Sequence, residues 1–477
     1  MSLSEDKLLL TNRNEKKTEW EMKKSITWVL LSLSAIVTYN PAAYAVGSTG
    51  FENASFSSYS LGQANAVVAQ ADEPATISYN PAGIVQLPGI QAQSNLGFVS
   101  SFTFYDGEGR GQSDTQSTGT IIPFPTAYFT VNPGRHLGNR VALGVGSDSP
   151  FGLAKKYEST HPISRYTGYD TWLEMYTIKP VISVKVTEKL LVGAGPMYYR
   201  IMDFGGVLKY PNALAGGAGT PDGQARLNLS GNDWGWHFGV LAKPHPKHQL
   251  GYYFRSPVTV TTTGLVKVEN SLFSGNGGRI ETGGSAKIDL PLNMTWAYAY
   301  KWSDKTTVEV DFGFTRWAAH KRLYIDAAPT GSAADNAILA AIGKNDKNWR
   351  NSFTVHLGGN HQVTKKLQLL AGSYWTTAAA PKTHFIPAVP DSNRVGFSVG
   401  FNYDFTRNFS AGANYLALIH LRRKINNSIS EVLGTSVDGK YFTYTQDFML
   451  SFTYKWDDVF DKRSQQGSIA GGPAAVS

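Results

Sequence analysis

Apolar and polar residues alternate along most of the chain from about residue 90 onward. Near the C-terminus, Phe442, Tyr444, Phe448, Leu450 and Phe452 share one parity, and Thr, Asp and Ser residues occupy most of the other. A period of two indicates β-strands with one apolar face. The pattern predicts fourteen such segments: 90–104, 123–131, 139–149, 172–186, 189–204, 232–243, 248–264, 286–302, 305–319, 349–362, 366–378, 393–405, 408–423 and 441–456.

The connections between these segments alternate in length. Short turns are predicted at 132–138, 187–188, 244–247, 303–304, 363–365 and 406–407. Long loops are predicted at 105–122, 150–171, 205–231, 265–285, 320–348, 379–392 and 424–440. Outer-membrane barrels have short turns on the periplasmic side, long loops outside, and aromatic residues at both interfaces. The predicted fold is therefore all-β: a transmembrane, antiparallel, 14-stranded barrel in the bacterial outer membrane, spanning residues 90–456.

Composition agrees with this class and excludes others. No run of 18 apolar residues occurs, which excludes a membrane protein built from spanning helices. Only 17% of residues are charged, while glycine and aromatic residues are abundant. The formal net charge of +8 is not concentrated in a basic stripe, so we expect no nucleic-acid partner.

Both ends of the chain carry segments outside the predicted barrel. Residues 22–45 have a basic start, an apolar stretch and a small-x-small site at Ala43–Ala45, which predicts a secretory signal peptide. Residues 1–21 are polar and wrongly placed for such a peptide, so we interpret Met22 as the true start and 1–21 as an upstream mis-start. A polar tail, 457–477, follows the last strand.

Residues 46–89 precede the first strand and do not alternate. The segment is Ala-rich and poor in charge, which makes it too apolar for a free tail. Asn80 can cap a short helix that begins at Pro81, and Ala82 and Gly83 follow. A fourteen-stranded barrel has an open lumen unless something fills it. We therefore expect 46–89 to be an N-terminal plug, or hatch, inside the barrel, with Asn80, Pro81 and Ala82 at its centre.

The mature chain resembles the FadL-type long-chain fatty acid transporters and their relatives that carry toluene and xylene. The resemblance is carried by "GFENASFSSYSLGQANAVVAQADEPATISYNPAGI", "LSGNDWGWHFGVLAKPHPKHQLGYYFRS", "IDLPLNMTWAYAYKWSDKTTVEVDFGFTRW" and "VPDSNRVGFSVGFNYDF". It implies a fourteen-stranded barrel closed by an N-terminal hatch. The chain departs from the family in its tail after Trp456 and in a long loop, 320–348, whose "AADNAILAAIG" suggests a helical lid.

The resemblance also implies sites for a hydrophobic small molecule. Two family loops form an apolar capture groove, and the matching loops here carry Val207, Leu208, Tyr210, Leu214, Leu265, Val266, Leu272 and Phe273. Candidate partners for a carboxylate head are Arg200, Arg394 and Lys321; the alternative for each is an ordinary solvated charge. Parity places Arg200 opposite Leu191 and Met197, and we expect it to point inward. Arg394 matches a family arginine by local motif.

The third strand is predicted to contain a lateral gate. Ser149, Pro150, Phe151 and Gly152 stand where the strand should still be pairing, and Pro150 removes a ladder donor. In the family this strand bends inward and opens the wall. The resemblance thus implies capture at outer loops, an internal pocket and sideways release, most readily of long-chain fatty acids.

Other chemistry is weighed and set aside. Gly396–Gly400 fits G-x-S-x-G, but it lies in mid-strand, whereas a hydrolase needs it at a strand-to-helix turn. His245 and His248 have no third metal ligand at a plausible spacing. We expect no enzyme, catalytic residue, metal or cofactor, and a monomer surrounded by outer-membrane lipid and lipopolysaccharide. Uptake of aromatic hydrocarbons and a general diffusion porin remain the alternative functions.

Overall fold

The computed structural model describes residues 50–107, 115–119, 121–161, 163–212, 216–217, 219–272, 274, 278–343, 345–426, 428 and 436–456. The predicted mis-start (1–21), signal peptide (22–45) and tail (457–477) lie outside the described residues, as do the first residues of the hatch.

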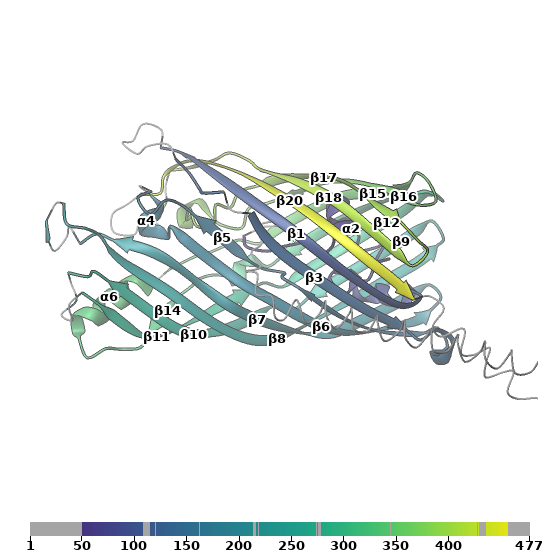
Figure 1. The fold of residues 1–477 in the computed structure, drawn as a ribbon, viewed down its shortest axis with the longest axis horizontal. Coiled ribbons are helices and arrows are strands. Elements are labelled where there is room, and N and C mark those ends of the chain that lie inside the picture. The colour runs from purple at the N-terminus through teal and green to yellow at the C-terminus, as the bar shows by residue number, and fades with distance from the viewer. Residues whose placement is uncertain are drawn as a thin grey trace, which may run out of the picture. The chain divides into compact units, whose positions relative to one another are not determined.

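Within the described residues, fourteen antiparallel strands form a closed wall, as the alternation predicts. The last strand pairs with the first from Ile90–Trp456 to Asp106–Lys440, which closes the ring (Figure 1). Because the first and last strands pair with each other, neither leaves a free edge along this seam. The wall consists of β1 (Gly89–Asp106), β3 (Ile121–Asn132), β4 (Val141–Asp148) with β5 (Leu153–Lys156), β6 (Asp170–Thr187), β7 (Leu190–Tyr210), β8 (Gly223–His245), β9 (His248–Arg255) with β10 (Val258–Glu269), β11 (Ile280–Leu290) with β12 (Asn293–Ser303), β13 (Thr306–Thr315), β15 (Ser352–Gln362), β16 (Leu367–Thr376), β17 (Arg394–Asp404), β18 (Phe409–His420) and β20 (Gly439–Trp456).

Three of these strands are divided in two, and each break contains a proline. Pro150 lies between β4 and β5, Pro257 between β9 and β10, and Pro291 between β11 and β12. Proline has no N–H to donate to a neighbouring strand, so the ladder is interrupted at each position.

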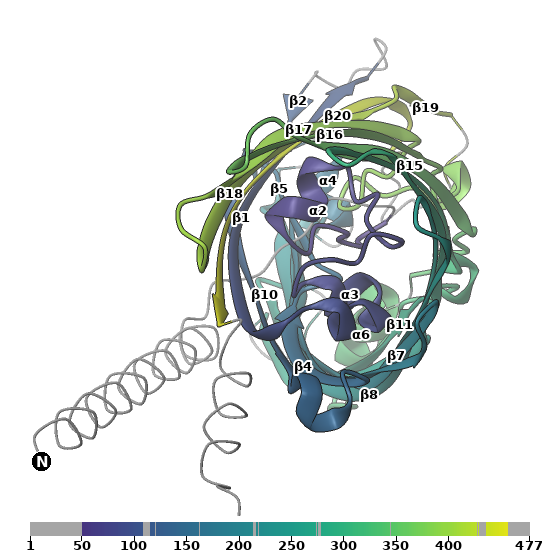
Figure 2. The same cartoon turned by 90° about the vertical axis from the view of Figure 1, so that its right-hand side faces the viewer.

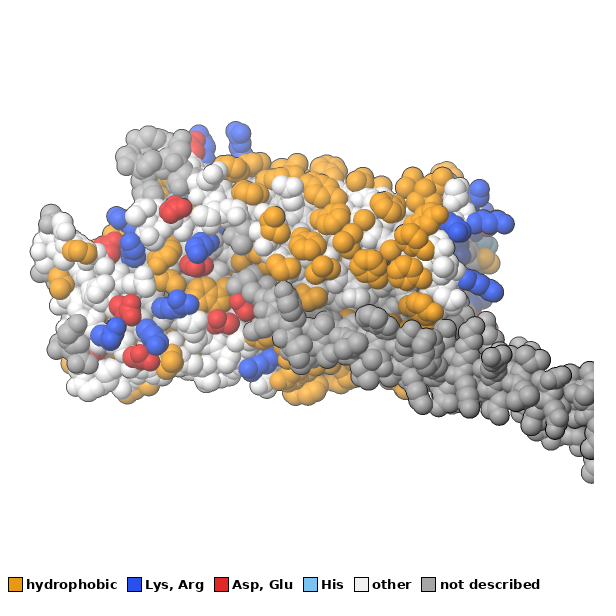
Figure 3. Space-filling model, in the orientation of Figure 1, with side chains coloured by type: hydrophobic (Ala, Val, Ile, Leu, Met, Phe, Trp, Pro, Cys, Tyr) orange, Lys and Arg blue, Asp and Glu red, His pale blue; other side chains and the backbone are white. Residues whose placement is uncertain are grey.

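The outer surface of the wall is apolar. Large side chains such as Trp234, Leu357, Phe397 and Val399 are exposed there. Figure 3 shows these side chains as a hydrophobic band between one end with basic side chains and another end where charges of both signs gather. Such a band is what a lipid-facing barrel requires. In the part of the chain that the structure describes, no helix is long and apolar enough to cross a membrane.

The hatch lies inside the ring of strands (Figure 2). It contains α2 (Ser58–Gly62), α3 (Thr76–Tyr79) and the 3₁₀ helix η1 (Pro81–Gln86). Ser57 caps α2 in a capping box with Ser60, and the Asn80 side chain accepts from the Ala82 N–H at the start of η1, as predicted. Buried apolar residues of the hatch pack against the inner face of the wall in the largest core cluster, which confirms that the segment is an internal plug.

Two predicted loops are shorter than expected. The predicted loop 205–231 contains the ends of β7 and β8, and the predicted loop 265–285 contains the ends of β10 and β11. The prediction was wrong there because glycine and polar residues obscure the alternation, while antiparallel pairing still satisfies the backbone. The remaining elements are β2 (Thr115–Gln116), η2 (Gly134–Leu137), α4 (Ser164–Thr167), η3 (Trp317–Ala319), β14 (Ile325–Ala327), α6 (Ala333–Gly343), η4 (Lys382–His384) and β19 (Arg423–Ile425). Helix α6 is the predicted helical segment of loop 320–348.

Candidate site: the opening in the third strand and its contact with the hatch

The third strand leaves the wall part-way along its length. β4 pairs with residues 127–131 of β3 and with β6, and it ends at Asp148. β5 then pairs only with β6. Residues 121–126 of β3 therefore pair with β1 on one side and have no third-strand partner on the other. Toward the outer end, the Thr118 amide donates to the Lys156 carbonyl at 2.9 Å and closes the gap. The result is an interruption in the wall between β3 and β5.

A buried polar cluster fixes the point at which β4 ends. Lys179 Nζ lies 2.5 Å from Asp148 Oδ2, and Thr177 Oγ1 donates to Oδ1 at 2.7 Å. The Tyr128 hydroxyl lies 3.3 Å from Oδ2, and the hydroxyl of Ser78, from hatch helix α3, donates to the same oxygen. Both charges are fully buried, so their pairing and hydrogen bonds are needed to offset desolvation.

The segment between β4 and β5 is joined to the hatch. The Asn53 amide donates to the Pro150 carbonyl at 2.8 Å, and the Gly152 amide donates to the Phe51 carbonyl at 2.9 Å. The Asn53 side chain also donates to the Ser149 carbonyl at 3.1 Å. The structure thus places a strand break at the four predicted gate residues and gives the freed backbone groups partners on the hatch. Their role as a gate stays a prediction.

An aromatic and aliphatic cluster lies behind this junction. Glu52 and Arg255 form a buried ion pair of 2.6 Å beside it, with the Arg255 guanidinium 4.6 Å from the centre of the Phe151 ring. A cavity of about 70 Å³ between the hatch and the wall borders the pair. The space is too small for a long alkyl chain. The cluster includes Phe51, Phe151, Met175, Met197, Trp317 and Trp349.

The central part of the hatch is fixed to the opposite side of the barrel by carboxylates. Glu309 of β13 accepts from the amides of Ala69 and Gln70 at 2.6 and 3.0 Å. Asp311 accepts from the amides of Val67 and Val68 at 3.3 and 3.4 Å. Four consecutive backbone donors of the hatch, residues 67–70, are therefore satisfied by two side chains of one wall strand.

The Asn-Pro-Ala segment, 80–82, packs against β6, β7 and β8. The Asn80 side-chain amide donates to the Val240 carbonyl at 3.1 Å, and the Ser183 hydroxyl donates to the Ala82 carbonyl at 2.9 Å. A side chain at Gly193 or Gly239 would overlap Pro81 or Asn80, so the wall approaches the hatch this closely because both positions are glycine. The predicted plug residues are thus part of the anchor, and residues 51–53 make the contact with the strand break.

The structure does not bring the three predicted basic residues together. Arg200 shares its parity with the outward Tyr198, which contacts the exposed Trp234, while Met197 and Tyr199 are buried on the inner face. The predicted inward orientation of Arg200 is therefore wrong. The error arose because both faces of β7 carry apolar residues, so its parity alone does not show which face is the lumen. Lys321 lies exposed near β14.

Arg394 points inward, as predicted, but it pairs with an internal carboxylate. Its guanidinium contacts Asp391, and both side chains are fully buried. Asp391 also accepts from the amides of Ala379 and Ala380 at 2.6 and 2.8 Å, and from the Gly50 amide at 3.3 Å. The Asp391 carboxylate therefore connects the start of the hatch, through Gly50, with the loop that contains Ala379 and Ala380.

The predicted capture residues do not all lie together. Leu208, Tyr210 and Val266 contribute to one apolar cluster on the inner face of the extended strands. Helix α6 covers this cluster through Leu339, with Ile338 and Ile342 packed beside it. Val207 is buried elsewhere, and Leu265 and Leu272 are exposed by 45% and 55%. Leu214 and Phe273 lie outside the described residues. A capture groove at this place stays a prediction.

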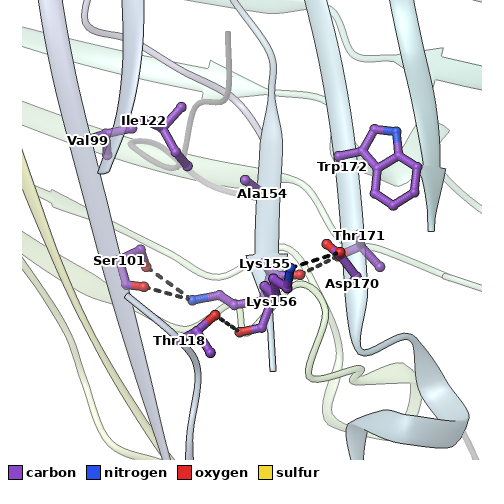
Figure 4. A pocket seen from close by; sticks show the side chains of 10 residues that line it. All are labelled: Val99, Ser101, Thr118, Ile122, Ala154, Lys155, Lys156, Asp170, Thr171 and Trp172. Atoms are coloured by element: carbon purple, nitrogen blue, oxygen red, sulfur yellow. Dashed lines mark hydrogen bonds and ion pairs between the residues drawn. The ribbon is translucent and has the colours of Figure 1, made fainter. Parts of the chain in front are cut away.

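A second cavity, of about 220 Å³, lies in the interruption of the wall (Figure 4). Lys155 of β5 extends across it to Ser101 of β1. Lys156 and Asp170 form a partly exposed ion pair of 3.8 Å at its rim. The lining residues are Val99, Ser101, Thr118, Ile122, Ala154, Lys155, Lys156, Asp170, Thr171 and Trp172. The cavity occupies the interruption that the missing third-strand pairing leaves open.

Comparison with known proteins gives the family. The sequence model of the outer membrane protein transport proteins (OMPP1/FadL/TodX) matches residues 40–456. The chain belongs to this family. It is similar to a putative outer membrane protein of Neisseria meningitidis serogroup B, with 26% identity covering 87% of this chain and 96% of the relative. It is also similar to the 47 kDa outer membrane protein of Pasteurella multocida, with 25% identity covering 83% and 92%.

Solved structures share the fold of this FadL/TodX-family barrel. A FadL homologue of Pseudomonas aeruginosa superposes with a TM-score of 0.72 at 19% identity, covering 85% of this chain and 99% of that one. The toluene transporter TbuX of Ralstonia pickettii gives 0.59 at 16% identity, covering 88% and 100%. The protein is thus an outer-membrane β-barrel of a family that transports hydrophobic compounds, and this family is one of transporters and channels rather than enzymes.

Sequence reasoning missed the buried charges around the opening. Asp148 and Lys179 lie on different strands, and Glu52 and Arg255 are 203 residues apart. A single charged residue on the inner parity of a strand was the only available signal, and it does not identify the partner. Lys155 is likewise a single charged residue on the inner parity of its strand, and the sequence alone does not identify what it contacts.

Proposed function

We propose that this FadL/TodX-family protein carries hydrophobic small molecules, long-chain fatty acids first among them, across the outer membrane and releases them sideways through the interruption between β3 and β5. The observation that carries the proposal is the departure of residues 149–152 from the wall toward the hatch. Such a barrel acts as a monomer surrounded by outer-membrane lipid and lipopolysaccharide.

The energetics of an alkyl chain favour the sideways route. Each methylene group favours an apolar environment over water by about 0.8 kcal/mol, so a chain of twelve favours it by roughly 10 kcal/mol. The hatch fills the lumen between the outer end and the periplasm, and release into periplasmic water would incur that cost. An opening in the wall lets the chain pass from the apolar interior to the apolar part of the bilayer without entering water.

A second candidate cargo is a small aromatic hydrocarbon. The interior cluster behind the gate is rich in aromatic rings, including Phe51, Phe151, Trp317 and Trp349, and such rings pack well against an aromatic ligand. One structural relative is named a toluene transporter. The hatch disfavours a general diffusion porin, because its buried apolar residues pack against the inner face of the wall.

A cross-link across the opening tests the lateral route. The chain contains no cysteine, so Ile122→Cys with Ala154→Cys places one thiol on each side of the cavity. A bifunctional thiol reagent should close the opening. We expect it to abolish oleate and toluene uptake by cells that have no other hydrophobic-compound transporter.

The matched control is Phe129→Cys with Val145→Cys, because these residues pair directly where β3 and β4 are still joined. Cross-linking that seam should leave uptake unchanged. Full uptake by the protein cross-linked across the opening would contradict lateral release. Comparing oleate with toluene in the untreated protein distinguishes the two cargo classes.

A further inference from the structure

The buried cations of this barrel differ in whether a carboxylate is paired with them. Arg255, Lys179 and Arg394 are each almost fully buried, and each forms an ion pair, with Glu52, Asp148 and Asp391. Lys155 and Lys347 are only 3% and 4% exposed, yet among the described residues no carboxylate lies within ion-pair distance of either ammonium. Of these two lysines, Lys155 lines the cavity in the wall. A buried charge without a counter-charge is costly. The wall therefore holds a cation at a position where it lacks an internal anion.

The neighbours of this ammonium are neutral oxygens. Lys155 Nζ lies 3.0 Å from Thr103 Oγ1, 3.3 Å from the Ser101 carbonyl, 3.4 Å from Ser101 Oγ and 3.5 Å from Ser117 Oγ. Ser101 Oγ also accepts from Thr445, and Ser117 Oγ accepts from the Thr103 amide. Because both serine hydroxyls act as acceptors in these contacts, each keeps a hydrogen that it can donate to an anion. The surroundings combine one positive charge with hydroxyl donors.

The cavity beside Lys155 has the size of a head group. Its volume of about 220 Å³ corresponds to roughly seven water molecules at about 30 Å³ each. That is enough for a carboxylate and a few methylene groups but not for a whole long alkyl chain. Val99, Ile122, Ala154 and Trp172 supply apolar lining next to the polar end. A longer tail has to leave the cavity through the interruption between β3 and β5, toward the lipid.

The charge of the lining also favours an anion. The lining contains two basic residues, Lys155 and Lys156, and one acidic residue, Asp170. Asp170 is paired with Lys156 at the rim. An uncharged hydrocarbon gains nothing from a buried ammonium, whereas an ionised acid forms a charge-assisted hydrogen bond with it.

We propose that this cavity binds the carboxylate head of an amphipathic acid at the point of exit, with Lys155 as its cation and Ser101 as a hydrogen-bond donor. The inference rests on the lateral route proposed above and adds to it the class of cargo. The head group is held in the wall while the tail enters the bilayer. Membrane lipids carry anionic heads of related chemistry, and the test separates these two sources.

The first experiment compares binding of oleic acid and of oleyl alcohol, which has the same chain without the charge, to the detergent-purified full-length protein. Lys155→Met should weaken oleate binding by about tenfold or more and leave the alcohol unchanged, because a hydrogen bond to a charged group is lost. Lys155→Arg should retain oleate binding. Lys366→Met, which removes a charge in an exposed turn, is the control and should change neither ligand.

A second variant leaves the lysine in place. Ala154→Asp adds a carboxylate to the cavity lining and should lower oleate affinity by competing for Lys155. Ala154→Asn adds the same volume without charge and should have a much smaller effect. This pair keeps the proposal testable if Lys155→Met does not fold, which heat-dependent electrophoretic mobility would show.

Several outcomes would overturn the proposal. Equal loss of acid and alcohol binding in Lys155→Met would show a purely structural lysine. Unchanged oleate binding in both Lys155→Met and Ala154→Asp, with normal uptake by the unaltered protein, would refute the head-group site and leave lateral transport intact. If anionic lipid vesicles, but not zwitterionic ones, displace oleate from the unaltered protein alone, the site belongs to membrane lipid. Failure of the unaltered protein to take up either ligand would refute the transport function and this inference together.

Discussion

The hatch is held at two junctions that differ in kind. At the anchor junction, residues 67–70 donate four backbone hydrogen bonds to Glu309 and Asp311, and Asn80–Ala82 fills the space left by two glycines of the wall. At the gate junction, residues 51–53 make two backbone hydrogen bonds with residues 149–152, with one ion pair and aromatic packing beside them. The first junction joins the hatch to uninterrupted strands, and the second joins it to a segment that has left its own sheet.

This difference indicates which junction can move. Opening the anchor junction would leave buried backbone donors without acceptors, which is costly for each group. The gate segment has already lost its regular wall pairing, and only a few bonds have to change for it to shift. If ligand binding moves the hatch, we expect the movement at residues 51–53 and 149–152 rather than at the anchor junction. The following changes test that distinction.

Removing both anchor carboxylates should have the largest effect. Glu309→Ala with Asp311→Ala leaves the amides of residues 67–70 without acceptors, at about 1–3 kcal/mol for each buried donor. We expect the hatch to loosen and the ion conductance of single barrels in a planar bilayer to rise. Glu309→Gln with Asp311→Asn retains a carbonyl acceptor at each site. Its ion conductance should therefore be lower than that of the double alanine variant. If the double alanine variant has the same ion conductance as the unaltered protein, Glu309 and Asp311 do not hold the hatch in place.

Breaking the ion pair at the gate junction should have the next largest effect. Glu52→Leu leaves the buried Arg255 without its carboxylate, a change that typically costs about 3–5 kcal/mol. We expect faster hydrogen exchange of the Gly152 amide with little change in conductance, because the anchor is intact. Adding Arg255→Met should recover most of the stability. If the ion conductance of Glu52→Leu rises as much as that of Glu309→Ala with Asp311→Ala, the two junctions do not differ in function.

Crowding the anchor should have a moderate effect. In Gly239→Ala the new methyl group overlaps the Asn80 side chain, and overpacking of this kind costs about 1–3 kcal/mol. The expected result is a lower melting temperature of the detergent-solubilised protein. Gly313→Ala is the matched control, because the new methyl group there meets only Thr354 at 3.6 Å, an ordinary contact distance. Equal melting temperatures for the two variants would count against close packing at Asn80.

The smallest effect should be a pH dependence from Glu73 of the hatch. Burial raises the pKa of Glu73 from 4.5 to about 7, even though Ser57, Gln93 and Tyr79 donate to its carboxylate. Between these values the folded protein binds more protons than the unfolded chain, so the free energy of unfolding falls as pH rises from about 4.5 to 7. Melting temperatures at pH 5 and 8 measure this. Glu73→Gln should flatten the dependence, and an unchanged slope would exclude Glu73 as its source.

Much of the local structure could be predicted without coordinates. Asn80 and Pro81 start η1 as expected, because capping depends on a side chain and an amide two residues apart. Pro150 interrupts the third strand as expected, because a missing N–H acts wherever the strand lies. Only part of the candidate site could be predicted from such local features. The break at residues 149–152 was found, but its hatch partners, almost a hundred positions earlier in the chain, were not.

The sequence by itself therefore determined the class of fold, the number of wall strands, the hatch and the place of the break, because alternation, turns and caps are properties of neighbouring residues. Only the tertiary structure decided which face of β7 is the lumen, which carboxylates hold the hatch, and that Lys155 meets Ser101 and Thr103 of β1. A period of two divides a strand into two faces without saying which one meets lipid, and in a plugged barrel both faces are apolar. Contacts across the ring join residues whose separation along the chain carries no local signal.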